Sequence, residues 1–231
     1  MKNINRVVLV QTVAAMCLLA GRYLFVVQHH SGYAALASFP GPGSKTLLFL
    51  GWNLFLAFVP YALTLLFPFL RYRLVGGVIL ATWLLFLPNA PYLITDLIHL
   101  RPRAPVPLLA DVLVFFFFAW TGLLLGLISM LNVRRYLSQW YTNRQLHGWM
   151  ALFVLLSSFG LFLGRVERWN SWEAFTHPIL LLQQSLVLLS NPTVMLISFL
   201  VFFSLLQGLG YLLLQRLSST HSTSTFQNIN S

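Results

Sequence analysis

Two side chains with acid–base chemistry, Asp96 and His99, stand three residues apart in the stretch YLITDLIHL. Helical residues three and four apart lie on one face, so Tyr92 would share the face of Asp96 and His99. A carboxylate beside an imidazole can relay a proton or bind a divalent metal. The alternative is a structural role, with Asp96 in a surface ion pair to Arg101 or Arg103. We treat Asp96 and His99 as catalytic candidates and Tyr92 as a substrate-binding candidate.

Other polar side chains interrupt apolar runs. Asp111 opens PLLADVLVFFFF, where it either complements a helix N-terminus or faces Asp96 as a third catalytic candidate. Asn53, inside GWNLFLAFVPY, needs a partner in hydrocarbon and is either a helix–helix contact or a substrate-binding group. Asn89 is a further substrate-binding candidate. Arg22 lies near the end of an apolar run, and we interpret it as extending to the membrane interface.

The stretch LGRVERWNSWE contains a second group of polar residues. Arg165 and Arg168 are three residues apart, so they would share a helical face, and guanidinium groups suit phosphate or carboxylate ligands. Asn170 and Glu173 have the spacing of a capping box. We take Arg165, Arg168 and Asn170 as substrate-binding candidates. The chain has no glycine-rich phosphate loop, serine elbow or HExxH pair, and a divalent metal is the less favoured alternative because no spacing is diagnostic.

Composition decides which elements must position these groups. Only 8% of the 231 residues are charged and 58% are hydrophobic. A soluble domain needs more polar surface than this, and the apolar runs are continuous rather than alternating. The fold class is therefore all-α, a polytopic bundle of transmembrane helices. The net charge of +10 does not indicate nucleic-acid binding, because no basic run has interleaved aromatic residues.

Six apolar runs are long enough to be transmembrane spans. They are Val7–Val27, Thr46–Phe67, Leu74–Ile94, Leu109–Leu131, Trp149–Leu163 and Thr193–Gln215. Residues 174–189 carry Pro178 and two glutamines, and they form either a short interfacial or re-entrant helix or a seventh span. We expect residues 1–216 to form a single transmembrane helical domain and residues 217–231 to be a polar, disordered tail.

Basic residues predict the orientation. With a cytoplasmic N-terminus and six spans, eight basic residues lie on the inner side and six on the outer side. The loops 88–111 and 164–175 then lie on the outer side, and all the candidate site residues fall in one layer. The predicted location is the inner membrane of a bacterium, with the lipid bilayer and a membrane protein as partners and no nucleic acid.

The two prolines of LPNAPY predict a break in the third span. Proline disfavours helical geometry at the residue before it, so we expect extended backbone at Leu87 and Ala90. Broken backbone at membrane depth is tolerated where protein or a water-filled cavity satisfies it. The prolines therefore predict a polar pocket close to the outer interface.

The stretch FLPNAPYLITDLIHL, with WNLFLAFVPY before it and LGRVERWNSWE after it, resembles a bacterial membrane family catalogued as domain of unknown function 1361. The similarity covers nearly the whole chain, from about Leu9 to Leu214. The resemblance implies a polytopic membrane protein. It implies neither an activity nor catalytic residues.

Three functions are compatible with these residues. The first is an enzyme or binding protein acting on a phosphate-bearing lipid or lipid-linked substrate, with arginines holding the phosphate and Asp96, His99 and Asp111 supplying acid–base chemistry. The second is a non-catalytic membrane partner or assembly factor, in which the polar layer joins helices. The third is a small-solute transporter, although the chain has no internal repeat and few polar groups on its inner half.

Overall fold

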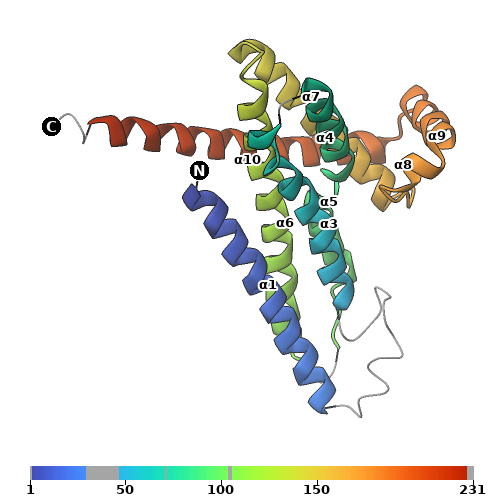
Figure 1. Cartoon of the computed structure of the whole chain (residues 1–231). Coiled ribbons are helices and arrows are strands. Elements are labelled where there is room, and N and C mark those ends of the chain that lie inside the picture. The colour runs from blue at the N-terminus through green and yellow to red at the C-terminus, as the bar shows by residue number, and fades with distance from the viewer. Residues whose placement is uncertain (1, 30–46, 71, 104–105, 228–231) are drawn as a thin grey trace. The chain divides into compact units, whose positions relative to one another are not determined.

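In the computed structural model the chain is helical, as the composition predicts (Figure 1). The structure describes residues 2–29, 47–70, 72–103 and 106–227, and no β-strand occurs among them. The long helices are α1 (Lys2–His29), α3 (Leu48–Thr64), α4 (Arg73–Phe86), α6 (Leu108–Leu137), α7 (Asn143–Arg165) and α10 (Val194–Gln227). The shorter ones are η1 (Phe67–Phe69), α5 (Asn89–Thr95), η2 (Asp96–His99), α8 (Glu173–Thr176) and α9 (Pro178–Ser190).

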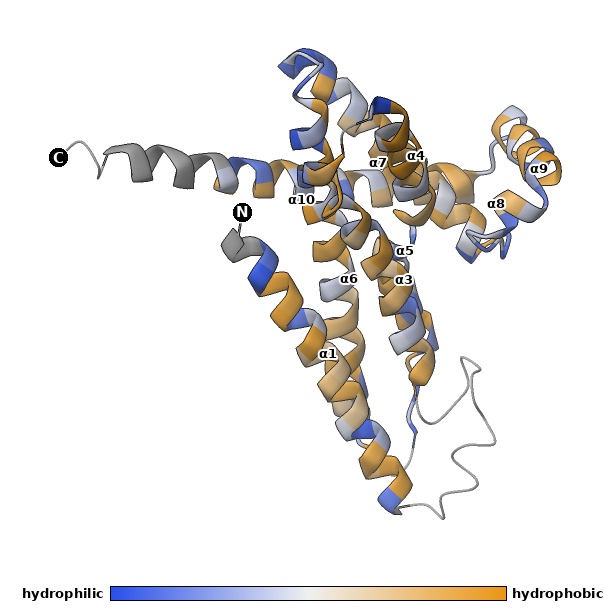
Figure 2. Cartoon of the chain, in the orientation of Figure 1, coloured by the Kyte–Doolittle hydropathy of each residue, from blue (hydrophilic) through white to orange (hydrophobic). Residues whose placement is uncertain are grey.

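Six helical segments of the described residues are long and apolar enough to cross a membrane, which confirms the predicted count. They are Asn5–Gln28, Leu48–Phe69, Arg73–His99, Leu108–Leu137, Asn143–Arg165 and Val194–Ser218. Hydrophobic residues dominate these helices (Figure 2). A helix in lipid satisfies its own backbone hydrogen bonds, so apolar length is a strong predictor of a span. The chain is therefore a multi-pass membrane protein.

The doubtful segment 174–189 is divided between α8 and α9. α9 has 13 residues, about 20 Å at 1.5 Å per residue, which is shorter than the roughly 30 Å of a bilayer core. This length is why it does not count as a seventh span. At the C-terminus α10 continues as a helix to Gln227, whereas the polar composition predicts disorder from residue 217. The division into domain 1–216 and tail 217–231 stays a prediction, and residues 228–231 lie outside the described residues.

The chain separates into two compact units. Unit 1 comprises Met1–Tyr61 and Asn89–Gly126, and unit 2 comprises Ala62–Pro88 and Leu127–Ser231. Unit 1 thus contains α1, α3 up to Tyr61, α5, η2 and the first part of α6. Unit 2 contains the last residues of α3, then η1, α4, the rest of α6, α7, α8, α9 and α10, and within it α7 and α10 are in extensive contact.

The proline segment is helical on both sides, and the predicted extended backbone is wrong. Leu87, after the last residue of α4, is right-handed helical with φ −55° and ψ −38°, and its N–H donates to the Trp83 carbonyl at 2.8 Å. Ala90 lies inside α5. Pro91 falls in the first turn of α5, where its missing N–H has no helical acceptor to lose. The third apolar segment therefore continues through the prolines to His99.

Two glycines accommodate this segment, one in each unit. In unit 1, a Cβ on Gly122 of α6 would lie 2.7 Å from the Ala90 carbonyl oxygen and 2.5 Å from Leu93. In unit 2, a Cβ on Gly160 of α7 would lie 2.6 Å from the Pro88 ring. Only glycine allows such close approach, so packing against helices stabilises a backbone that proline alone disfavours.

Candidate functional site

Charged side chains are buried together at one end of unit 1. Arg22 lies about two turns before the end of α1, Asp96 is the first residue of η2, and Asp111 lies in the first turn of α6. Within the described part of the chain, Arg22, Asp96, Arg103 and Asp111 are the buried charged residues. Ionisable groups in a membrane protein are costly to bury, so such a group indicates a functional site by default. We call these four residues, with Asn53 and His99, the unit 1 polar cluster.

Arg22 of α1 and Asp111 of α6 form a bidentate ion pair. The Arg22 Nε donates to one Asp111 carboxylate oxygen at 2.6 Å and its Nη2 donates to the other at 3.0 Å. The side chains are 5% and 0% exposed. Our interpretation that Arg22 extends to the interface is therefore wrong, because its guanidinium turns inward to a carboxylate. Asp111 also lies in the first turn of α6, where a negative charge is favourable.

Arg103 is a second buried guanidinium beside the same carboxylate. Its Nη1 lies 3.8 Å from an Asp111 oxygen, and its Nη2 donates to the His99 carbonyl at 2.6 Å. Its Nε is buried and has no hydrogen-bond partner among the described residues. Burial lowers the pKa of Arg103, Asp111 opposes that shift, and Arg101 and Arg22 add to it. Arginine nevertheless stays protonated in proteins, so Arg103 remains a cation.

Asp96 is a buried carboxylate, only 1% exposed, and accepts a hydrogen bond from the Asn53 Nδ2 at 2.7 Å. This burial contradicts the alternative of a surface ion pair. Residues three apart eclipse in a 3-10 helix, so η2 keeps Asp96 and His99 on one side. The His99 ring packs edge-on against Phe49 with centroids 5.7 Å apart. Asp96 is thus the polar partner that the Asn53 amide needs, while the functional roles of Asn53 and Asp96 stay predictions.

The other candidates in unit 1 lie in α5. Asn89 is its first residue and Tyr92 lies one turn later, and both are half-buried. The Tyr92 carbonyl accepts a hydrogen bond from the Thr95 hydroxyl at 2.6 Å. Their predicted contact with substrate is untested.

The arginine pair after α7 is arranged differently from the prediction. α7 ends at Arg165, and Arg168 is exposed with a left-handed φ of 63°. The two side chains therefore do not share a helical face. The reason is that the sequence VERWN leaves the helix at once, with the Trp169 N–H donating to the Leu163 carbonyl at 3.0 Å.

Only one of the two hydrogen bonds of the predicted capping box at Asn170 and Glu173 is present. The Asn170 backbone N–H donates to the Glu173 carboxylate at 2.5 Å, but Trp172 rather than Asn170 is the residue before α8, and no side chain caps that helix. A full capping box occurs instead at Thr142 and Gln145, before α7. The T-x-x-Q spacing is its sequence signal.

Sequence reasoning missed a neutral polar network in unit 2. The Ser157 hydroxyl donates to the Gln207 Oε1 at 2.9 Å, and the Gln207 Nε2 donates to the Ser158 hydroxyl at 3.1 Å. Ser204 also donates to Ser158, at 3.1 Å. These bonds join α7 to α10. Gln207 is an amide within a long apolar run, which is the signal that could have identified it.

The chemistry available to the unit 1 polar cluster is that of anion binding and proton transfer. Arg103 has donor capacity that its described neighbours do not use, and Asp96 and His99 are titratable groups close along one short helix. Among the described residues no three His, Cys, Asp or Glu side chains are grouped so that they could bind a metal ion.

Comparison with known proteins identifies one relationship. The family model described as protein of unknown function (DUF1361) matches residues 52–207. No curated protein and no solved structure matches the chain.

Proposed function

The chain belongs to the DUF1361 family of proteins of unknown function, and from its polar cluster we propose that it binds a phosphate-bearing lipid or lipid-linked substrate. The single observation that carries this proposal is Arg103, a buried guanidinium with an Nε that has no hydrogen-bond partner among the described residues. A buried N–H group without a hydrogen-bond partner raises the free energy of the folded state, and a ligand oxygen that accepts its hydrogen bond would remove this penalty.

The chemistry of Arg103 supports an anionic ligand. Arg22 already forms two bonds with Asp111, so this pair is satisfied without a ligand. Arg103 is a second guanidinium beside this pair, and a guanidinium matches phosphate geometry. In this proposal Arg103 contacts the phosphate, the Arg22–Asp111 pair positions it, and Asp96 and His99 are the candidate acid–base groups.

The test compares Arg103 with its neighbour Arg101, which is exposed. The purified protein in detergent is heated with dihexanoyl phosphatidic acid, or with dihexanoylglycerol, which lacks the phosphate. A ligand that binds only the folded state at about 100 times its Kd stabilises that state by about 2.7 kcal/mol. We expect phosphatidic acid to raise the Tm of the wild type and of Arg101→Gln, but not of Arg103→Gln.

Two results would contradict the proposal. One is an equal rise in Tm for Arg103→Gln and wild type. The other is an equal rise with dihexanoylglycerol, which would mean that the phosphate is not recognised.

A second candidate function is a non-catalytic membrane partner, for which the same cluster would serve only to join helices. The Arg22–Asp111 ion pair favours this candidate, because its two hydrogen bonds join α1 to α6 without a ligand. It predicts that Arg103→Gln lowers stability without changing any response to phosphatidic acid.

The proposal also places the protein in the inner membrane of a bacterium, with a cytoplasmic N-terminus and with the cluster near the outer face. The support is the distribution of basic residues between loops. Pro102 and Ser138 are exposed and lie at opposite ends of α6. In a Cys17→Ala background we expect Pro102→Cys, but not Ser138→Cys, to react with a membrane-impermeant thiol reagent on intact cells. Reaction of Ser138→Cys alone would reverse the orientation.

A further inference from the structure

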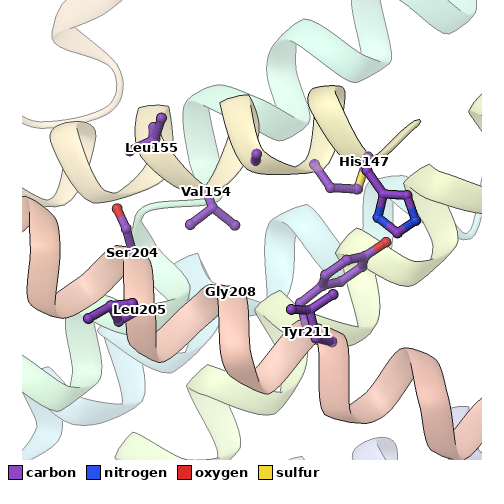
Figure 3. A pocket seen from close by; sticks show the side chains of 10 residues that line it. His147, Val154, Leu155, Ser204, Leu205, Gly208 and Tyr211 are labelled. Carbon is purple, nitrogen blue, oxygen red and sulfur yellow. The ribbon is translucent and has the colours of Figure 1, made fainter. Parts of the chain in front are cut away.

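A groove lies between α7 and α10 in unit 2. It has a volume of about 440 Å³. The two helices run antiparallel along it, with His147 and Tyr211 at one end and Leu155 and Ser204 at the other (Figure 3). The α7 part of the lining, residues 147–155, extends for about 12 Å at 1.5 Å per residue. The groove is thus long and narrow.

The walls of the groove are almost entirely apolar. Met150 and Val154 form buried parts of the lining, at 2% and 5% exposed. Leu155, Leu205 and Leu212 are exposed and line the same groove. A groove of this kind on a multi-pass membrane protein can receive a hydrocarbon chain.

One end of the groove is polar and positively charged. The buried Tyr211 hydroxyl accepts a hydrogen bond from Arg134 Nη1 at 3.4 Å, and Arg134 Nη2 donates to the Asn143 side-chain oxygen at 3.2 Å. Arg135 follows Arg134 in the last turn of α6, and Arg144 lies in the first turn of α7. The four acids of the chain are Asp96, Asp111, Glu167 and Glu173, and no described ion pair joins any of them to Arg134. The positive charge at this end is therefore not neutralised by a carboxylate.

We propose that the α7–α10 groove binds an anionic phospholipid, with an acyl chain along the apolar lining and the headgroup phosphate at Arg134, His147 and Tyr211. Charge complementarity selects this occupant, because an uncharged hydrocarbon would leave the basic end unmatched and a soluble anion would not use the apolar length. This site is distinct from the unit 1 polar cluster and involves none of its residues.

The structure offers matched variants for the test. Arg134→Gln removes the charge next to Tyr211 but keeps a hydrogen-bond donor, while Arg135→Gln removes an exposed charge one residue away. Gly208→Leu fills the groove, because a Cβ there meets nothing within 4 Å. Gly148→Leu is its control, since Gly148 is equally unobstructed and does not line the groove.

The experiment uses the full-length protein in detergent with phosphatidylglycerol carrying a photoreactive group on its acyl chain. Cross-linked peptides are identified by mass spectrometry, and phosphatidylcholine with the same acyl chain is the uncharged comparison. We expect labelling of segments 147–155 and 204–212, about tenfold weaker in Arg134→Gln and lost in Gly208→Leu. Tenfold corresponds to one charge-assisted hydrogen bond of about 1.4 kcal/mol. The control variants should label like wild type.

Four results would overturn the proposal. Labelling that Gly208→Leu leaves unchanged would place the lipid elsewhere. Equal loss in Arg134→Gln and Arg135→Gln would indicate general attraction to a basic surface. Equal labelling by phosphatidylcholine, or protection of both segments by a second copy of the chain, would assign the groove to another occupant. None of these variants alters Arg103, so the phosphatidic acid test above remains independent.

Discussion

The two compact units differ in the charge of the polar groups that they bury. Unit 1 buries the charged side chains of Arg22, Asp96, Arg103 and Asp111 as well as the neutral Thr121, whereas the buried polar residues described in unit 2 are all neutral: Thr64, Ser129, Ser157, Ser158 and Gln207. Both arrangements join helices that are far apart in the sequence. A neutral hydrogen bond across membrane helices contributes little and needs no particular protonation state. A buried charge is costly without its partner, so it is retained where it contributes more than packing.

The unit 2 contacts follow this neutral pattern beyond the α7–α10 network. The Trp83 Nε1 donates to the Ser129 hydroxyl at 3.0 Å, and the Asn132 Nδ2 donates to the Thr64 hydroxyl at 3.0 Å. Each bond satisfies a polar group that would otherwise be unpaired in an apolar interior. Unit 2 therefore joins its helices without buried charges. Because neutral groups suffice for this purpose, the buried charges of unit 1 need a further explanation.

Breaking the ion pair should have the largest effect. Arg22→Ala leaves the Asp111 carboxylate buried with only the more distant Arg103, so we expect the free energy of unfolding to fall by about 3–5 kcal/mol. The measurement is unfolding by sodium dodecyl sulfate in mixed micelles, followed by circular dichroism.

The double variant Arg22→Leu/Asp111→Leu is the control for charge. It removes both partners and should be closer to wild type in stability than Arg22→Ala, because replacing both partners leaves no unpaired buried charge. The double variant could instead lose as much free energy of unfolding as the single variants Arg22→Leu and Asp111→Leu lose together. In that case the two side chains are not coupled, and the contrast between the units disappears.

Breaking the neutral network should have a smaller effect. Gln207→Leu removes the bonds of Gln207 to Ser157 and Ser158, and we expect a loss of about 1 kcal/mol in the same assay. Gln183→Leu in α9 is the matched control, because Gln183 is exposed and should leave stability unchanged.

The losses in free energy of unfolding for Arg22→Ala and Gln207→Leu can be compared directly. A loss for Gln207→Leu that equals the loss for Arg22→Ala would show that burial depth, and not charge, decides the energetic difference between the units.

The sequence by itself determined the class of the fold and the number of spans. Apolar length is a local property, and a helix in lipid satisfies its own backbone, so the six runs could be identified without knowing their neighbours. Asp96 and His99 were also recognisable in the sequence as polar interruptions of an apolar run, but the sequence left open whether Asp96 lies in a surface ion pair. The T-x-x-Q capping box before α7 was present in the sequence as well, and local spacing would have sufficed to find it.

The partners of the buried polar groups depend on how distant helices pack. Arg22 and Asp111 are 89 residues apart, and nothing in the local pattern around Arg22 distinguishes an inward pair from a side chain extended to the interface. The conformation at Leu87 and Ala90 was predicted wrongly for the same reason. Local proline preferences favour extended backbone, but close packing at Gly122 and Gly160 and the position of Pro91 in a first turn make the helical path the stable one. Pairings between distant helices depend on how the helices pack, and that information is spread over the whole chain.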